Sequence, residues 1–226
     1  MLVKTNKMSN VKAFILDMNG TMIDDMPYHI RAWHDIVTRL GASLTLQQVK
    51  EQCYGKNEEL LERIFPGRFS VEEKKQIEHE KETYYQRVYK DDMKAIDGLQ
   101  EFLAKAWSHD IHIAIGSAAI MFNIDFILDG LDLRPYFKTI VSADHVEISK
   151  PDPETFLKAA ADLGVPPENC LVFEDAPKGV ETALNAGMQC VVLTTMHTKE
   201  EFGNYPNIIC FISDYTDPVL NQLFAG

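Results

Sequence analysis

Positive charge is scarce in this 226-residue chain. Lys and Arg together number 22 against 34 Asp and Glu, which gives a formal net charge of −12. A surface this acidic repels nucleic acid and anionic lipid, so we expect neither as a partner. An anionic substrate is compatible with this charge only where a metal ion or a placed lysine supplies positive charge locally.

Cysteine is also scarce, and its spacing carries no metal-binding signature. No CxxC pair or Cys/His cluster is present, and most of the cysteines stand in apolar runs. We interpret them as small buried hydrophobic residues of a protein in a reducing compartment. The four positions are Cys53, Cys170, Cys190 and Cys210.

Long apolar runs, internal repeats and low-complexity tracts are missing. No run approaches the roughly 20 apolar residues of a membrane span. The first ten residues, MLVKTNKMSN, contain no apolar stretch of signal-peptide length. We therefore expect a cytoplasmic protein with no membrane partner, and nothing in the sequence requires more than a monomer.

Short apolar, β-branched runs recur along the chain. Most are continuous rather than alternating, which is typical of strands buried on both faces of a parallel sheet. Helical patterns separate them: residues 98–108 carry an apolar stripe that Trp107 extends, and residues 153–164 run from Pro153 to Gly164. The alternation predicts a doubly wound, Rossmann-like α/β core. The expected strands are 11–16, 111–116, 138–143, 170–174, 189–194 and 207–212.

Residues 24–94 break this alternation, because they contain only helical patterns. Thr45 and Ser70 are placed as helix N-caps, and Ser70 has a glutamate three residues later. The charged stretch 70–90, with the run EEKKQIEHEKE, is expected to face solvent. We predict an all-α domain at 24–94, inserted into a core formed by 1–23 and 95–226, with hinges at 24–26 and 93–97.

Polar residues follow four of the expected strands. Asp17 closes the first strand, Ser117 the second and Glu174–Asp175 the fourth, while Lys150 follows the third. Ligands of doubly wound folds bind where the carboxyl ends of parallel strands meet. Crowded carboxylates repel one another unless a cation lies among them, and Mg²⁺ prefers such oxygen ligands together with phosphate and water. The lysine and the serine are suited to hold phosphate oxygens.

Four motifs in this order, DMNGT, GSAA, SKPDP and FEDAPKGV, carry a family resemblance. With them the chain resembles the haloacid dehalogenase-like superfamily over 11–23 and 95–195, in the branch with a helical cap after the first strand. The stretch MPYHIRAW is similar to the β-phosphoglucomutases and related phosphatases. The resemblance implies that the inserted domain is a cap.

The same resemblance implies phosphoryl transfer through an aspartyl-phosphate on Asp17. Ser117 and Lys150 would bind the transferring group, and the substrate would be a small phosphorylated metabolite. Mg²⁺ would be the cofactor, held by Asp17, the backbone carbonyl of Asn19 and Asp175, with Glu174 nearby. The remaining candidate substrate residues are Thr21 and Ala118 beside the motif residues, and His29, Lys56 and Glu58 in the cap.

Asn19 departs from the family pattern, which has an aspartate that protonates the leaving oxygen and then activates water. An amide can do neither, and acid–base help of this kind is typically worth about 10²–10⁴-fold in rate. Three explanations are open. The enzyme is slow, or another group such as His29 carries the proton; or the substrates have good leaving groups; or the chain is an engineered Asp→Asn variant.

A second departure concerns the second phosphate that a mutase must hold. At the position of the family's cap arginine stands Glu58, and the polar stretch after the phosphate-binding serine is replaced by Ala119-Ile120-Met121. Lys56 is the only nearby cation. We therefore favour a phosphatase; a β-phosphoglucomutase-like mutase and a catalytically impaired phosphate-binding protein are the alternatives.

Overall fold

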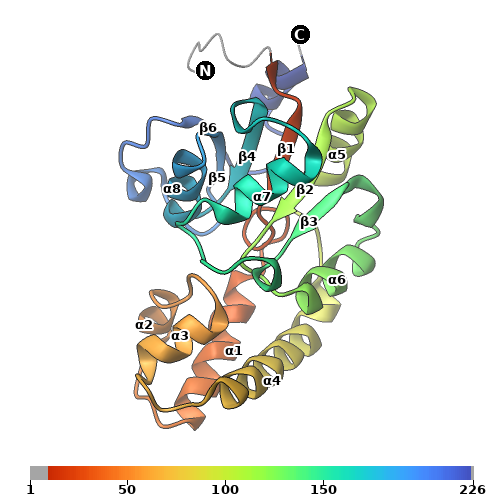
Figure 1. Ribbon diagram of the computed structural model, residues 1–226. Helices are drawn as coiled ribbons and strands as arrows, with labels where there is room; N and C mark the ends of the chain where they lie inside the picture. Colours follow the sequence, from red (N-terminus) through yellow and green to blue (C-terminus); the bar gives the residue numbers. More distant parts are fainter. Residues whose placement is uncertain (1–9, 225–226) are drawn as a thin grey trace. The chain divides into compact units, whose positions relative to one another are not determined.

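The core of the protein is a six-stranded, all-parallel sheet, as predicted. The computed structural model describes residues 10–224. The strand order is β3-β2-β1-β4-β5-β6 (Figure 1). β1 lies between β2 and β4, so the strand order reverses beside β1: β2 and β3 lie on one side of it and β4, β5 and β6 on the other. Ligands of such sheets bind at the point where the strand order reverses. The strands are β1 (Ala13–Leu16), β2 (His112–Gly116), β3 (Thr139–Val141), β4 (Cys170–Glu174), β5 (Gln189–Leu193) and β6 (Ile208–Ile212).

Both faces of this sheet are buried, which explains the continuous apolar runs. On one face Ile15 and Val172 belong to an apolar cluster that also contains Phe156 of α7. On the other, the rings of Phe14 and Phe173 pack edge to face with centroids 5.3 Å apart. The α-helices that alternate with these strands are α5 (Leu99–Ser108), α6 (Met121–Gly130), α7 (Glu154–Leu163) and α8 (Pro177–Asn185).

Trp107 contradicts the sequence-based expectation, because it is 69% exposed rather than part of the core. The buried stripe of α5 consists of Leu99, Phe102, Leu103 and Ala106. Trp107 follows Ala106 by one residue, about 100° further around the helix, and this rotation takes it off the stripe.

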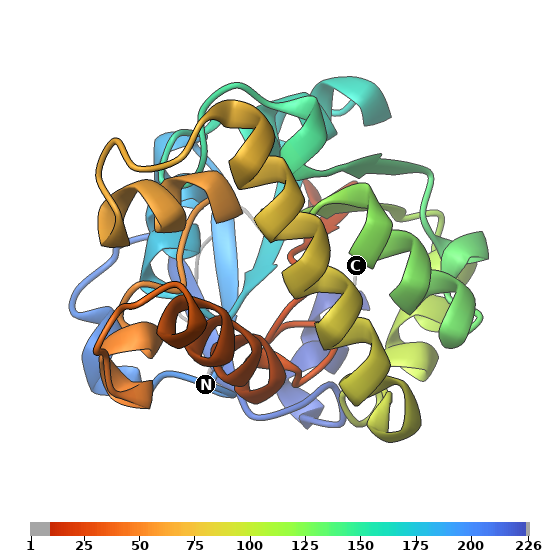
Figure 2. The ribbon, with the colours of Figure 1, turned by 90° about the horizontal axis from the view of Figure 1, so that it is seen from below.

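Residues 10–224 divide into two compact units, one formed by residues 10–24 and 94–224, the other by Asp25–Met93. The second unit, which we call the cap, is all helical and has a separate apolar cluster that includes Trp33, Val37 and Leu61. In it α1 and α4 pack along each other (Figure 2). Its helices are α1 (Met26–Arg39), α2 (Leu46–Lys50), α3 (Asn57–Ile64) and α4 (Val71–Tyr89).

The predicted N-caps in this unit are confirmed. The side chains of Thr45 and Ser70 accept hydrogen bonds from the amides of Gln48 and Glu73, and both complete a capping box. Across residues 10–224, none of the helices combines the length and the apolar character that a membrane crossing requires.

Candidate active site

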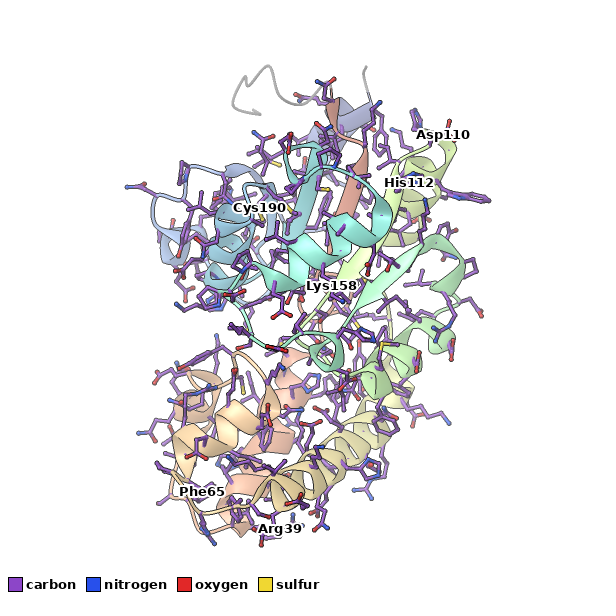
Figure 3. The ribbon with its side chains drawn as sticks, in the orientation of Figure 1. Arg39, Phe65, Asp110, His112, Lys158 and Cys190 are labelled. Atoms are coloured by element: carbon purple, nitrogen blue, oxygen red, sulfur yellow. The ribbon has the colours of Figure 1, made fainter. Side chains whose placement is uncertain are left out.

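Asp17 stands at the carboxyl end of β1, where the sheet hydrogen bonding stops. Its amide still donates to the Phe173 carbonyl of β4 at 3.0 Å. The chain then turns tightly, because the amides of Thr21 and Met22 both donate back to the Met18 carbonyl, at 3.2 and 2.8 Å. Asp17 is therefore presented at the strand-end edge of the sheet. Asp110 and His112 mark the opposite end of β2 (Figure 3).

Three buried carboxylates gather at this edge. Asp17, Glu174 and Asp175 each offer an oxygen, and these atoms lie within 4.8 Å of one another. Lys150 is buried with them, its Nζ 2.9 Å from Asp17 Oδ1 and 2.7 Å from Glu174 Oε1. Three carboxylates and one ammonium leave a formal charge of −2 in a buried place, which a single divalent cation would neutralise. Their oxygens are the donors that Mg²⁺ prefers, so the cluster fits this ion.

Two glycines make room for these carboxylates. A Cβ placed on Gly20 would lie 2.0 Å from Asp175 Oδ2, and one on Gly179 would lie 1.7 Å from Glu174 Oε1. Glu174 uses this space to accept hydrogen bonds at 2.9 Å from the amides of Asp175 and Ala176. The segment between β4 and α8 thereby fixes the glutamate, and the turn after β1 confines Asp175.

Burial and crowding shift the titration of these groups. Burial, and then the charge of Glu174, raise the pKa of Asp17 to about 6 although Lys150 and a hydrogen bond from Ser117 lower it. Burial, followed by Glu174 and Asp17, raises the pKa of Asp175 well above its usual range. Burial lowers the pKa of Lys150, but the two carboxylates it contacts outweigh this and raise it, so the ammonium keeps its charge. A cation would relieve the repulsion that both aspartates experience.

The loop after β2 brings Ser117 to the same edge. Ser117 is buried, and its amide donates to the Val141 carbonyl at 2.9 Å, which extends the pairing of β2 with β3. Its hydroxyl accepts from the Ala119 amide at 3.2 Å and lowers the pKa of Asp17. Ala118 follows, half-buried in this loop.

The turn after Asp17 contains two further residues that the sequence predicts for the site, Asn19 and Thr21. Asn19 is half-buried and forms a single bridge with Ile23. Thr21 is fully buried, and its Oγ1 has no hydrogen-bond partner within residues 10–224.

In the cap, His29 of α1 lies inside a buried polar cluster. Its Nε2 is 3.2 Å from Asp25 Oδ2, and its Nδ1 is 2.6 Å from Lys81 Nζ. Its ring stacks on Tyr85, whose hydroxyl hydrogen-bonds Asp25. Lys81 Nζ also donates to Glu82 Oε1 at 2.9 Å, so both ring nitrogens of His29 already face charged groups of the cap.

The expectation that 70–90 faces solvent is wrong for Lys81 and Glu82, which are each 2% exposed. Lys81 stands on the stripe of α4 that also carries Ile77 and Tyr85, four residues before and after it. That spacing is the signal that could have found it. Glu82 accepts a further hydrogen bond from Asn57 Nδ2 at 2.7 Å, at the start of α3.

Lys56 and Glu58, the other two candidate substrate residues of the cap, lie at the start of α3. Lys56 is the N-cap of α3, and its amide donates to Glu59 Oε2 at 3.0 Å. Glu58 is exposed in the first turn. A carboxylate there is suited to a helix N-terminus, whose partial positive charge it stabilises.

Comparison with known proteins agrees with this geometry. The haloacid dehalogenase-like hydrolase family matches residues 14–193, and the chain belongs to this family. It is 30% identical over 177 residues to the fructose-1-phosphate phosphatase YqaB of Escherichia coli, covering 78% of this chain and 93% of that protein. It is 31% identical over 191 residues to the β-phosphoglucomutase of Bacillus subtilis, covering 80% and 82%.

Solved structures show the same fold. A family IA hydrolase of Entamoeba histolytica superimposes with a TM-score of 0.85 at 27% identity, covering 95% of this chain and 98% of that one. The chain is therefore an enzyme of the haloacid dehalogenase-like class, with the parallel core and helical cap that the sequence predicted.

Proposed function

We propose that the protein is a Mg²⁺-dependent phosphatase that acts on a small phosphomonoester through an aspartyl-phosphate on Asp17. The observation that carries this proposal is the contact of Asp17 with Lys150 inside a buried carboxylate cluster of charge −2. Phosphorylated sugars are the proposed substrate class, because relatives that cover most of this chain are named as phosphatases of such compounds.

In the first step an oxygen of Asp17 forms a bond to phosphorus while the ester P–O bond breaks. The leaving group departs as an alkoxide and takes a proton from water to become the alcohol. The Lys150 ammonium lies 2.9 Å from this carboxylate and holds the arriving phosphoryl oxygens. The Ser117 hydroxyl, which lowers the pKa of the same carboxylate, offers a further contact. In the second step water attacks phosphorus, the P–O bond to Asp17 breaks, and the carboxylate is restored. The proton that the water loses passes to the released inorganic phosphate.

Mg²⁺ would be held by Asp17, the Asn19 backbone carbonyl and Asp175, with Glu174 beside them, and would neutralise the charge of the phosphate as the two anions meet. Glu174 fixes the Lys150 ammonium at 2.7 Å and is itself fixed by two backbone amides. Its role in this proposal is to orient the lysine.

The proton that the leaving alcohol needs has no carrier at Asn19. His29 is a poor replacement, since its ring nitrogens already contact Asp25 and Lys81. We therefore expect slow turnover of sugar phosphates, and faster cleavage of esters whose leaving group departs without a proton.

The test compares wild-type protein with Asn19→Asp, in Mg²⁺, on para-nitrophenyl phosphate and on a hexose phosphate. We expect wild-type protein to cleave the aryl ester, and Asn19→Asp to raise turnover of the hexose phosphate by about 100-fold or more. Asp17→Asn is the matched inactive control, and mass spectrometry should find the phosphoryl group on Asp17. An Asn19→Asp variant no faster than wild-type protein would contradict our account of this position.

A mutase is the second candidate, favoured by the 31% identity to a β-phosphoglucomutase. One contact speaks against it. The Met121 amide at the start of α6, just after the Ser117 loop, donates to Asp144 Oδ2 at 2.8 Å. The Asp144 carboxylate thus already accepts from the amide that the helix start would otherwise offer to a second phosphate. Conversion of one hexose phosphate isomer into another with a bisphosphate primer would establish the mutase instead.

We also propose that the cap opens and closes at 24–26 and 93–97 to admit substrate and exclude water. The boundaries between the two compact units, Asp24/Asp25 and Met93/Lys94, fall within these segments and support the proposal.

A further inference from the structure

Two hydroxyl groups from the end of the core reach back to the turn that follows Asp17. Thr195, just after β5, donates from Oγ1 to the Gly20 carbonyl at 2.6 Å. Tyr215, after β6, donates from its hydroxyl to the next carbonyl, that of Thr21, at 3.1 Å. Both residues lie beyond residue 193, where the family match ends. They therefore add contacts to the site that none of its motifs contains.

The acceptor of the first contact is the residue against which Asp175 lies. Gly20 has φ +75, and a Cβ on it would meet Asp175 Oδ2 at 2.0 Å. Its amide donates to the Ile23 carbonyl at 2.7 Å, so Thr195 supplies the second anchor of the same residue. Glycine has the widest backbone freedom of any residue, so a second hydrogen bond restricts the backbone more at Gly20 than it would at a residue with a side chain.

Tyr215 is a rigid donor. It is 5% exposed, and its ring packs against Phe102 and Phe173 with centroids 5.1 and 5.9 Å away. Its amide donates to the Asp97 carbonyl at 2.9 Å, so one residue holds both the chain that leaves β1 and the chain that returns from the cap. Burial, and then the carboxylates of the site, raise the pKa of this phenol well above its usual range, so the hydroxyl keeps the proton it donates.

We propose that Thr195, assisted by Tyr215, is a positioning residue that holds Gly20 against Asp175 and thereby sets the affinity of the carboxylate cluster for a divalent cation. The inference rests on the proposed function in taking Mg²⁺ as that cation. Groups that orient metal ligands typically change metal affinity by about 10–100-fold when removed. Because Gly20 keeps its backbone hydrogen bond to Ile23, we expect the lower end of this range.

The experiment titrates Mg²⁺ alone into the full chain, followed by isothermal calorimetry without substrate. Thr195→Val removes the hydroxyl at nearly constant volume and should weaken Mg²⁺ binding by about tenfold. Thr195→Ser keeps the donor and should restore most of the affinity. Thr194→Val is the matched control, because the Thr194 hydroxyl donates at 3.2 Å to the Ile212 carbonyl of β6 and not to the turn.

An equal loss of Mg²⁺ affinity in Thr194→Val and Thr195→Val would overturn the inference, since the effect would then belong to strand-end packing. Unchanged affinity in Thr195→Val would also overturn it. Should that variant not fold, Tyr215→Phe decides alone, with weaker Mg²⁺ binding and faster amide hydrogen exchange at Thr21 expected. Because binding is measured without turnover, failure to hydrolyse esters would refute the proposed function and leave this inference standing.

Discussion

Replacement of Gly20 by alanine distinguishes backbone strain from damage to the carboxylate cluster. Gly20 has φ +75, a left-handed conformation that costs an L-residue roughly 1–2 kcal/mol. Gly187 has nearly the same φ, +74, but a Cβ there would meet no atom within 4 Å. Both alanine variants should therefore lose about 1–2 kcal/mol of unfolding free energy in urea.

The two variants should differ in metal binding. A Cβ on Gly20 would lie 2.0 Å from Asp175 Oδ2 and 2.4 Å from its Cγ, so the carboxylate must move. Because these atoms end a side chain and are not backbone, the movement adds little to the stability loss. It removes one of the three carboxylates from the cluster, however, and Mg²⁺ affinity should fall by about 100-fold.

The assay is calorimetric Mg²⁺ titration of both variants beside equilibrium urea unfolding, with Gly187→Ala as the control. Gly187→Ala should bind Mg²⁺ like wild-type protein. If Gly20→Ala also binds Mg²⁺ with wild-type affinity, the cluster does not hold the ion through Asp175, and the reasoning about this turn is refuted.

Three further predictions concern stability. Gly179→Ala, which would ordinarily stabilise a helix by about 1 kcal/mol, should lower the unfolding free energy in urea. Its Cβ would lie 1.7 Å from Glu174 Oε1, and moving this carboxylate breaks its hydrogen bonds with Lys150 and two backbone amides; a more stable variant would contradict this. The pKa of Asp17 is about 6 in the folded protein against 3.8 ordinarily, so folded protein binds the proton more tightly. Without metal, the free energy of unfolding should therefore fall by up to about 3 kcal/mol as pH rises from 4 to 6, and Mg²⁺ should restore this stability above pH 6. Thermal unfolding across this pH range, with and without Mg²⁺, measures the effect. A pH profile that does not change with Mg²⁺ would refute the prediction. Lys81→Met removes the buried ammonium that contacts His29 and Glu82 and should cost about 3 kcal/mol in urea, whereas Lys75→Met on the exposed face should cost almost nothing; equal losses would contradict the buried polar cluster of the cap.

Much of the core could be predicted because its signals are local. Each buried strand is a short continuous apolar run, and each polar residue that ends a strand is visible in the sequence. Parallel strands place their carboxyl ends at one edge, so Asp17, Lys150 and Glu174 were expected together before any distance was known. Their contacts of 2.7–2.9 Å agree with that expectation, while their catalytic roles stay predictions.

Several features could not be predicted, because they depend on contacts between distant parts of the chain. Lys81 belongs to a run of charged residues; its spacing from Ile77 and Tyr85 places it on the stripe of α4, but its partner His29 stands 52 positions away in α1. The contacts of Thr195 and Tyr215 with the first turn span 175 and 194 positions. A threonine or a tyrosine outside any motif gives no local sign of such an acceptor.

The sequence by itself determined the strands, the inserted helical domain and the kinds of chemical group at the strand ends, because these follow from periodicity and from the order of residues along the chain. Only the tertiary structure decided which charges are buried, which glycines must lack a side chain and which hydroxyls hold the turn after Asp17. The physical reason is that burial, close packing and hydrogen-bond partners are properties of atoms that meet in space, and residues far apart in sequence supply them.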